Sequence, residues 1–300
     1  PPAALTAPLP DSARHGPGVV VARGALDRAL QEAAVEAGAE LRRRSVNRSV
    51  TRHGDRHRAQ LRTNGSTTEI EATLLVGADG VGSSVARGLG WGGPTTAGRR
   101  YGVSYSLDAG QMDEVAEQTI LMTVGREGYL GVVRQDAGLH AAALLREGVS
   151  LADGFARLDP ARATTSRGGV GHDVLACGPF PWRPRRRAAS GAALVGDAAG
   201  YVEPFTGEGM TWAFESAEAL AGAALHSAAR VGRPCFDEDA ARRYVETWQR
   251  GVGRGHRRCG RVAATLDRPW LMRTAALACR ACPPVSARLA ERVARSMVAA

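Results

Sequence analysis

The stretch from Ala192 to Ala224 constrains the fold of this chain more than any other. It opens with the apolar run 192–195, which is short enough for a buried strand, and this run stops at Gly196-Asp197. A loop with proline and glycines follows, and then a long alanine-rich segment with the spacing of a helix. This order of strand, acid, glycine loop and helix is how an α/β sheet presents a ligand site at the carboxyl ends of its strands.

A second apolar run, 74–76, also ends at an acid followed by glycine, Asp79-Gly80. Glycines let the backbone approach a flat ligand closely. The helix that begins near Gly209 directs unpaired N–H groups and a partial positive charge toward whatever binds there. We therefore expect Asp79 and Asp197 to lie at neighbouring strand ends and to bind the same ligand.

The sequence of residues 196–210, GDAAGYVEPFTGEGM, resembles the second FAD-binding motif of a flavoprotein superfamily. That superfamily includes the p-hydroxybenzoate-hydroxylase-like monooxygenases and the geranylgeranyl reductases, and this form is closer to the reductase branch. The resemblance implies that Asp197 hydrogen-bonds a ribitol hydroxyl of FAD and that the glycines lie against the flavin ring. A glycine loop that only caps a helix is the alternative. The residues assigned to FAD in this motif are Gly196, Asp197, Pro204, Gly207, Gly209 and Met210.

Two earlier segments resemble the same superfamily. The R-x-x-L-D-x-x-L pattern that starts at Arg23 implies that this arginine approaches the FAD phosphates, although an exposed arginine at a helix start explains it equally well. The segment 77–83, GADGVGS, resembles an Asp-Gly motif and assigns Asp79 and Gly80 to FAD and to a transient visit of NADPH. The arginine that usually follows stands one position late, at Arg87, which rotates it by about 100° on a helix. We give Arg87 no such role.

These motifs predict a mixed α/β (α+β) protein, in which a Rossmann-like FAD-binding domain carries an inserted antiparallel β-sheet substrate domain and C-terminal helices. The predicted boundaries are 1–97 for the first part of the FAD-binding domain, 98–180 for the inserted sheet, 181–230 for the second part of the FAD-binding domain and 231–300 for the helical region.

Periodicity predicts most of the individual elements. Tyr129 is expected in the core of the inserted sheet rather than facing a flavin. The predicted elements are a helix that ends at Gly38, a β-meander over 39–51, 56–62 and 69–76 with a hairpin at Asn64-Gly65, strands at 101–105, 119–124, 129–134 and 139–145, and helices at 236–250, 262–281 and 285–298.

The G-x-G-x-x-G pattern occurs only as GLGWGG at 88–93, where no apolar strand-like run precedes it, and the glycines of 251–255 do not match it. In relatives, that fingerprint belongs to the first βαβ unit and binds the adenosine side of FAD. We interpret the sequence as lacking this N-terminal unit. Truncation and loss of the adenine-side site both explain its absence.

The net charge of +9 comes from 39 arginines, because the chain contains no lysine. The arginines are scattered without interleaved aromatics, so we expect no nucleic-acid partner. The runs 42–44 and 185–187 are interpreted as solvated faces or strand edges. The basic C-terminal helices could make peripheral membrane contact or pack against the flavin domain. We expect a cytoplasmic location, because no signal peptide or membrane-spanning run is found, and the oligomeric state is open.

Five cysteines form an odd set, which argues against a disulfide framework. Cys279 and Cys282, with His256 and Cys259 upstream, could be given a zinc spacing, but the segment between them reads as an apolar helix. No metal site is predicted.

The resemblance implies an FAD-dependent oxidoreductase that takes electrons from NADPH and reduces carbon–carbon double bonds in a lipid-like or polyketide, apolar small-molecule substrate. Hydroxylation by an FAD-dependent monooxygenase through a flavin hydroperoxide is the alternative enzyme, and a truncated, non-catalytic remnant is the alternative of another class. The W-x-W-x-I-P signature and the lysine of flavin-dependent halogenases are absent, which argues against halogenation. No catalytic acid is assigned, since turn geometry explains Glu208 as well as catalysis does.

Overall fold

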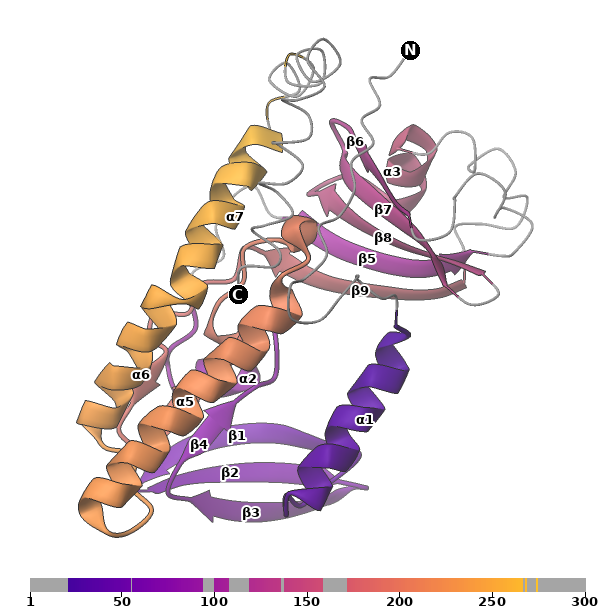
Figure 1. The fold of residues 1–300 in the computed structure, drawn as a ribbon. Coiled ribbons are helices and arrows are strands. Elements are labelled where there is room, and N and C mark those ends of the chain that lie inside the picture. Colours follow the sequence, from indigo (N-terminus) through magenta and orange to yellow (C-terminus); the bar gives the residue numbers. More distant parts are fainter. Residues whose placement is uncertain are drawn as a thin grey trace. The chain divides into compact units, whose positions relative to one another are not determined.

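The computed structural model describes residues 21–54, 56–93, 100–107, 119–135, 138–158, 172–266, 268 and 274. The chain forms two compact units, each assembled from separate stretches of sequence (Figure 1). The first unit comprises 1–40, 98–177 and 261–300, and the second comprises 41–97 and 178–260.

The first unit contains one helix near its start and a five-stranded sheet. Helix α1 spans Arg23–Glu36 and is followed by Gly38 with φ +96°, a conformation that glycine adopts without strain. The strand order in the sheet is β6-β7-β8-β5-β9 (Figure 1). Its strands are β5 (Arg100–Leu107), β6 (Ile120–Val124), β7 (Gly128–Gln135), β8 (Gly138–Arg146) and β9 (His172–Phe180). The pairs β5–β8, β6–β7 and β7–β8 are antiparallel, as the alternating pattern predicts.

Helix α3 (Leu151–Leu158) completes the core of this sheet. Its start is capped by Ser150, whose hydroxyl accepts a hydrogen bond from the Asp153 N–H at 3.0 Å. Phe155 packs edge-on against Tyr105, with ring centroids 5.7 Å apart. Tyr129 is buried with 6% of its surface exposed, which confirms the prediction of a core tyrosine.

The second unit begins with the antiparallel meander β1-β2-β3, formed by β1 (Ser45–His53), β2 (Arg56–Thr63) and β3 (Ser66–Ala72). Asn64 (φ +50°) and Gly65 (φ +89°) join β2 to β3 with two positive φ angles, the conformation that an Asn-Gly hairpin favours. The third predicted strand, 69–76, is divided between two sheets, because β3 ends at Ala72 and β4 spans Leu75–Gly77.

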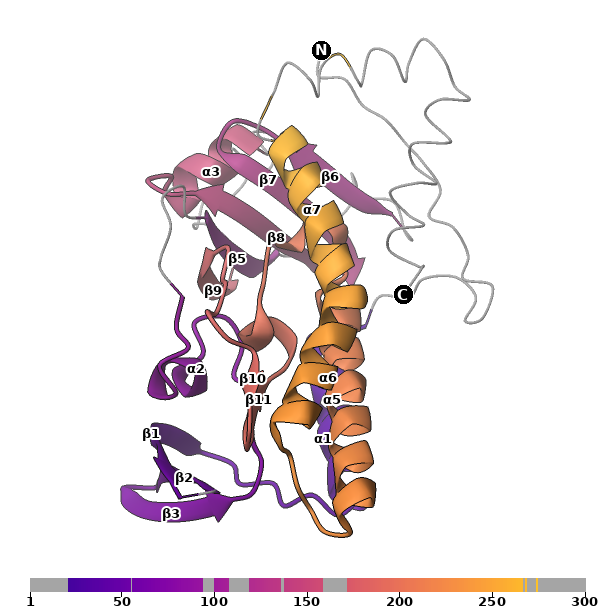
Figure 2. The ribbon, with the colours of Figure 1, turned by 90° about the vertical axis from the view of Figure 1, so that its left-hand side faces the viewer.

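A three-stranded sheet with the order β10-β11-β4 lies at the centre of the second unit. Strand β10 (Ala188–Ala189) runs antiparallel to β11 (Ala192–Leu194), and β11 runs parallel to β4. The meander and the short helix α2 (Ser84–Gly88) lie on one side of this sheet, and the helices α5 and α6 lie on the other (Figure 2). The remaining elements are the 3₁₀ turns η2 (Gly196–Ala199) and η3 (Pro204–Thr206) and the helices α5 (Gly209–Val231), α6 (Glu238–Arg250) and α7 (Val252–Leu266).

Glycine allows close packing between neighbouring elements of this core at Gly77 and Gly255. A Cβ on Gly77 would lie 2.6 Å from the Leu194 Cδ2, so the contact between β4 and β11 requires glycine. A Cβ on Gly255 would lie 2.6 Å from the Trp212 Nε1, where α7 packs on α5. Helix α7 begins at Val252, so the prediction of a helix starting at 262 was wrong. Glycines lower helix propensity, which is why the segment 251–260 was not predicted as helical. In the structure, Gly255 serves the packing of α7 on α5.

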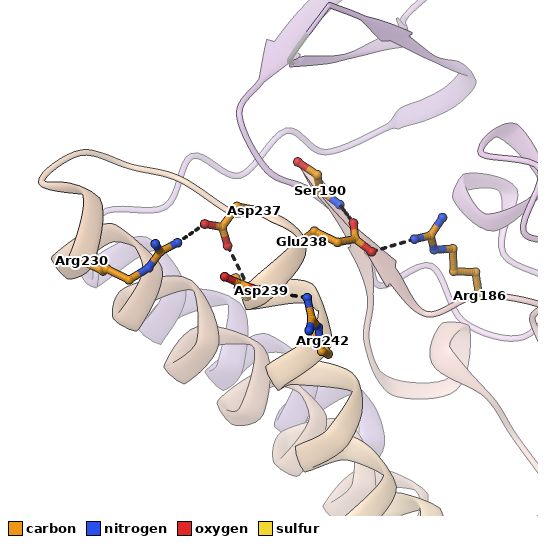
Figure 3. A network of polar contacts seen from close by, with 8 residues as sticks. Arg186, Ser190, Arg230, Asp237, Glu238, Asp239 and Arg242 are labelled. Atoms are coloured by element: carbon orange, nitrogen blue, oxygen red, sulfur yellow. Dashed lines mark hydrogen bonds and ion pairs between the residues drawn. The ribbon is translucent and has the colours of Figure 1, made fainter.

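A polar network fixes the start of α6 next to the β10–β11 turn (Figure 3). The Asp237 carboxylate accepts a hydrogen bond from the Ala240 N–H at 2.9 Å and pairs with Arg230. The Glu238 carboxylate accepts hydrogen bonds from Arg186 at 2.9 Å and from the Ser190 N–H at 3.2 Å. The helix is therefore attached to the sheet at this end as well as through its buried face.

The observed elements confirm the predicted mixed α/β fold, the meander, the strand before Gly196 and the helix that starts at Gly209. Helix α3 and strand β9 were not predicted. The predicted helix at 285–298 and the part of 262–281 beyond α7 lie outside the described residues, apart from Arg268 and Thr274. Among the described helices, none has the length and apolar character needed to cross a bilayer. Peripheral membrane contact stays a prediction.

We expect Gly77→Ala to lower the free energy of unfolding by about 1 to 3 kcal/mol, because the added methyl forces Leu194 and Val85 out of their positions. Urea denaturation followed by circular dichroism measures the change. Gly222→Ala is the matched control, since nothing lies within 4 Å of a Cβ at this position in α5 and alanine should stabilise the helix by about 0.5 to 1 kcal/mol. Equal effects of the two substitutions would contradict the packing argument.

Candidate functional site

The second unit brings two of the predicted acids to the same edge of its central sheet. Strands β4 and β11 are parallel neighbours in which Gly77 pairs with Leu194, and the Val195 N–H donates to the Gly77 carbonyl at 2.9 Å. Asp79 follows the end of β4 and Asp197 follows the end of β11, so both loops leave the sheet at the same side. This is the edge at which α/β sheets bind ligands.

The carboxylate of Asp79 accepts hydrogen bonds from the first N–H groups of helix α2, whose N-cap residue is Ser83. Its Oδ1 accepts a hydrogen bond from the Ser83 hydroxyl. Its Oδ2 accepts from the Ser84 N–H at 2.7 Å, from the Ser84 hydroxyl at 2.8 Å and from the Val85 N–H at 3.2 Å. Most of the acceptor capacity of this carboxylate is therefore used by the helix that follows it.

These hydrogen bonds also set the charge of Asp79. Partial burial alone would raise the pKa of this carboxyl, but the hydrogen bonds from Ser83, Ser84 and Val85 outweigh burial and lower the pKa below its ordinary value. Asp79 is therefore an anion at neutral pH, and it is exposed near the start of the loop 78–82. Its contact with a cofactor stays a prediction, because capping alone explains an acid at this position.

The loop after β11 is held by a buried hydroxyl. Gly196 adopts φ +56°, and its N–H donates to the Ser216 hydroxyl on α5 at 2.7 Å. The Ser216 hydroxyl donates in turn to the Ala213 carbonyl at 2.9 Å, and its side chain is completely buried. The acid-bearing turn and helix α5 are thus one hydrogen-bonded assembly. Asp197, next to Gly196, is half-buried.

Two glycines of the candidate site leave their backbone uncovered by other atoms. Gly80 (φ +76°) and Gly207 (φ +71°) both adopt the left-handed conformation, and a Cβ at either position would find no atom within 4 Å. Their positive φ explains why glycine stands there, and the open space leaves their backbone accessible to a flat ligand. These features fit the approach of a flavin.

Helix α5 begins directly after this glycine loop. The 3₁₀ turn that starts at Pro204 ends at Gly207, and the first residues of α5 are Gly209 and Met210. Glu208 precedes the helix and is buried, but its carboxylate does not cap the helix. Met210 exposes 47% of its surface. The unpaired N–H groups at this helix start carry the partial positive charge that an anionic ligand edge would use.

Arg23 is not grouped with these residues. It belongs to the first unit, at the first position of α1, where its guanidinium is 71% exposed and pairs with Asp27 at 2.6 Å. Its contact with FAD phosphates stays a prediction. Arg87 is exposed and hydrogen-bonds the Gly82 carbonyl within its own loop.

Three side chains near the turn 196–200 were not predicted from the sequence. The run 185–187 was expected to be a solvated face or a strand edge, but Arg187 is half-buried, with its Cζ 3.8 Å from the centroid of the Trp248 ring. Tyr244 is completely buried, and its hydroxyl donates to the Leu194 carbonyl at 2.5 Å. His256 packs edge-on against Trp212 and Trp248. The aromatic spacing of α6 was the signal that could have revealed this cluster.

The described cysteine, histidine and acidic side chains do not gather into a metal site. Within the described ranges, no group of three or more His, Cys, Asp or Glu side chains is arranged to hold an ion. Cys259 is buried, with its thiol 3.4 Å from the Glu203 carbonyl. Cys279 and Cys282, which define the alternative zinc spacing, lie outside the described residues.

Residues 11–133 match a protein family described as an FAD binding domain. This part of the chain is therefore similar to FAD binding domains, and the acids and glycine loops at one sheet edge fit that similarity. The match covers less than half of the chain, and it agrees with the resemblance to FAD-dependent oxidoreductases that the motifs carry.

Two curated relatives are reductases of isoprenoid lipids. Geranylgeranyl diphosphate reductase of Nicotiana tabacum is 41% identical over 73 residues, which are 24% of this chain and 16% of that protein. Digeranylgeranylglycerophospholipid reductase 2 of Methanothermobacter thermautotrophicus is 30% identical over 209 residues, which are 66% of this chain and 52% of that protein. The chain therefore matches about half of the archaeal relative and a smaller part of the plant one.

Solved structures share the fold at low sequence identity. The flavoprotein/dehydrogenase of Cytophaga hutchinsonii superposes with a TM-score of 0.70 at 16% identity, over 91% of this chain and 68% of that chain. CabE, an aromatic hydroxylase from angucycline biosynthesis, superposes with a TM-score of 0.66 at 18% identity, over 93% of this chain and 58% of that chain. These similarities establish the fold and leave the reaction open.

We expect Asp79→Ala to destabilise the protein by about 1 to 2 kcal/mol, because helix α2 loses the acceptor for its first N–H groups. Thermal and urea unfolding measure the loss. Asp27→Ala is the matched control, since the exposed pair with Arg23 should contribute no more than about 0.5 kcal/mol. Similar losses in both variants would show that the capping of α2 contributes little.

The His256 side chain should make stability depend on pH. Burial beside Trp212 and Trp248, with a smaller effect of the Arg187 and Arg183 charges, lowers its pKa from 6.5 to about 4. As the pH falls below about 6.5, the unfolded chain takes up this proton but the folded chain does not. The stability due to neutral His256 is therefore complete above pH 6.5 and is lost as the pH falls toward 4.

We expect this residue to account for about 2 kcal/mol of the stability that is lost between pH 7.5 and pH 5. Urea denaturation of the wild type and of His256→Gln at both pH values measures it. The variant should lose less stability over this interval than the wild type. An identical pH dependence in the two proteins would contradict the assignment.

Proposed function

We propose that this protein is an FAD-dependent oxidoreductase that takes electrons from NADPH and reduces carbon–carbon double bonds in an apolar, lipid-like or polyketide substrate. The observation that carries this proposal is the parallel pair β4–β11, which directs Asp79 and Asp197 to the edge where helix α5 begins. The reductase activity is supported by 41% identity over 73 residues to a geranylgeranyl diphosphate reductase.

Each element of the site has a definite part in this proposal. Asp197 accepts a hydrogen bond from a ribitol hydroxyl, and the turn at Gly196 that positions it is fixed by Ser216. Gly80 and Gly207 keep side chains away from the ligand. The N–H groups at the start of α5, next to Gly209 and Met210, stabilise negative charge at the pyrimidine edge of the ring.

When FAD is bound, it supplies hydride transfer, and the protein supplies orientation and electrostatics. The charged Asp79 maintains α2 and the glycine loop 78–82, so that its effect on the cofactor is exerted through the shape of the loop. No side chain of the described residues is assigned as the proton donor.

Hydroxylation of an apolar substrate with molecular oxygen is the second candidate. The fold shared with the aromatic hydroxylase CabE supports it, whereas the two relatives described above that were found by sequence are reductases. A protein that binds no flavin is the third candidate. A measurement of FAD binding distinguishes this candidate from the two enzymes and therefore comes first.

The test of cofactor binding is titration of the purified protein with FAD, followed by the visible absorption and fluorescence of the flavin. We expect the wild type to bind FAD and Asp197→Ala to bind it about tenfold or more weakly, because a charge-assisted hydrogen bond is lost. Asp239→Ala on the exposed start of α6 is the control and should bind as the wild type does. A wild-type protein that binds no FAD would contradict the proposal.

The reaction is then decided by incubation with NADPH and geranylgeranyl diphosphate in the presence and absence of oxygen. Reduction predicts products that gain pairs of hydrogen atoms and form under anaerobic conditions. Hydroxylation predicts products that gain an oxygen atom and form only with oxygen. The latter outcome would replace the first candidate by the second.

A further inference from the structure

Strand β6 forms one edge of the five-stranded sheet in the first unit, where it has a single neighbour, β7 (Figure 1). The Gly125 N–H donates to the Gly128 carbonyl at 2.9 Å, across the turn between these two strands. Backbone groups of an antiparallel strand point alternately to its two sides, so those of Val124, Met122 and Ile120 point away from β7. Among the described residues, no strand pairs with this outer side of β6.

The side chains of β6 are apolar on both faces of the sheet, and none of the residues 120–124 carries a charge. Ile120, Met122 and Val124 lie on one face and Leu121 on the other, and all four are exposed. The Met122 sulfur lies over β7, since a Cβ on Gly131 would be 2.9 Å from its Sδ. The side chain of Met122 therefore leaves the outer backbone of β6 uncovered.

The other edge strands of the described sheets carry features that hinder pairing with another strand. Strands β4 and β10 are only three and two residues long. The longer edges carry a bulge with Arg48 and Arg52 in β1, Glu69 and Glu71 in β3, and Pro179, which has no N–H group, in β9. Strand β6 has five residues without a charge, a proline or a bulge. Among the described edges, it is the one without such protection.

The outward-pointing residues of β6 complement themselves. They are symmetric about Met122, so a two-fold axis at this residue places it opposite Met122 of a second copy and places Ile120 opposite Val124 of that copy. Each such pair exchanges two N–H···O bonds, and apolar side chains meet on both faces of the sheet. Because the strand is uncharged, no like charges oppose each other. A row of unpaired backbone groups is satisfied by an extended strand, and here the chain itself supplies one.

We propose that β6 is the contact surface of a symmetric dimer, in which two copies of this chain join their five-stranded sheets into one continuous sheet. The contact uses the unpaired edge of both copies, so assembly stops at two chains. A pairing of five residues is small for a stable interface, and we expect a micromolar rather than a nanomolar dissociation constant. The proposal rests on no part of the flavin chemistry proposed above.

Sedimentation equilibrium of the full chain through the micromolar concentration range tests the dimer. We expect the mass to rise from that of one chain, 31.5 kDa, toward twice this value. A mass that stays at 31.5 kDa throughout would overturn the proposal. Growth beyond two copies, as pairing of β6 with β9 of the next copy would give, would overturn it as well.

Three variants locate the contact. Met122→Pro removes the N–H that points to the second copy and leaves the hydrogen bonds between β6 and β7 in place. We expect it to raise the dissociation constant of the dimer at least about tenfold, because the hydrogen bonds between the two Met122 residues are lost. Ile120→Lys changes a side chain that is 54% exposed, keeps the test decisive if the proline variant does not fold, and should weaken the dimer by a similar factor.

Leu225→Lys is the matched control, since it replaces an apolar side chain of α5 that is 70% exposed. It should leave the dissociation constant unchanged. A dimer that Ile120→Lys leaves intact, or that Leu225→Lys weakens equally, would place the contact elsewhere and overturn the proposal.

Oxidative cross-linking tests the register. The Cα atoms of a hydrogen-bonded antiparallel pair lie about 5.5 Å apart, which a disulfide can span, so oxidised Met122→Cys should form a covalent dimer on a non-reducing gel. In Val124→Cys the two introduced thiols stand four residues apart along the paired strands, about 13 Å, and should not cross-link. Both variants retain the exposed Cys177, so its contribution is the same in each. Equal cross-linking of the two variants would overturn the pairing about Met122.

Discussion

The close parallel pairing of β4 and β11 is the contact on which the rest of the second unit depends. Leu194 packs where a side chain on Gly77 would otherwise stand, and the Val195 N–H continues the pairing to the Gly77 carbonyl. This contact joins two stretches of sequence that are separated by the whole inserted sheet. It therefore sets the distance between the two glycine loops and makes a single edge out of two separate motifs.

Buried polar side chains then fix what the strands have brought together. Ser216 binds the Gly196 N–H, and Tyr244 binds the Leu194 carbonyl. Each joins a helix to the backbone at or directly after β11, where the sheet ends and the backbone would otherwise leave buried groups unpaired. The helices α5 and α6 are thus more than an apolar cover, because each satisfies one backbone group near the acid-bearing turn.

The sequence was informative where the local signal and the fold agree. The turn at Asn64-Gly65 could be predicted because both residues favour the positive φ angles that they adopt. The start of α5 at Gly209 could be predicted because the glycine loop before it interrupts the helical pattern. The capping role of Asp79 and the burial of Arg187 could not be read in this way. Both depend on neighbours that become known only in the fold: the orientation of α2 for Asp79, and Trp248, distant in sequence, for Arg187.

The two sides of β11 carry opposite charges at this edge of the sheet. Asp79 and Asp197 stand after β4 and β11, and Arg187 stands on the side of β10. His256 can remain beside the cations because it is neutral at physiological pH, and its protonation would add a third positive charge to this side. The lowered pKa of this imidazole follows first from its burial beside Trp212 and Trp248 and second from the Arg187 and Arg183 charges.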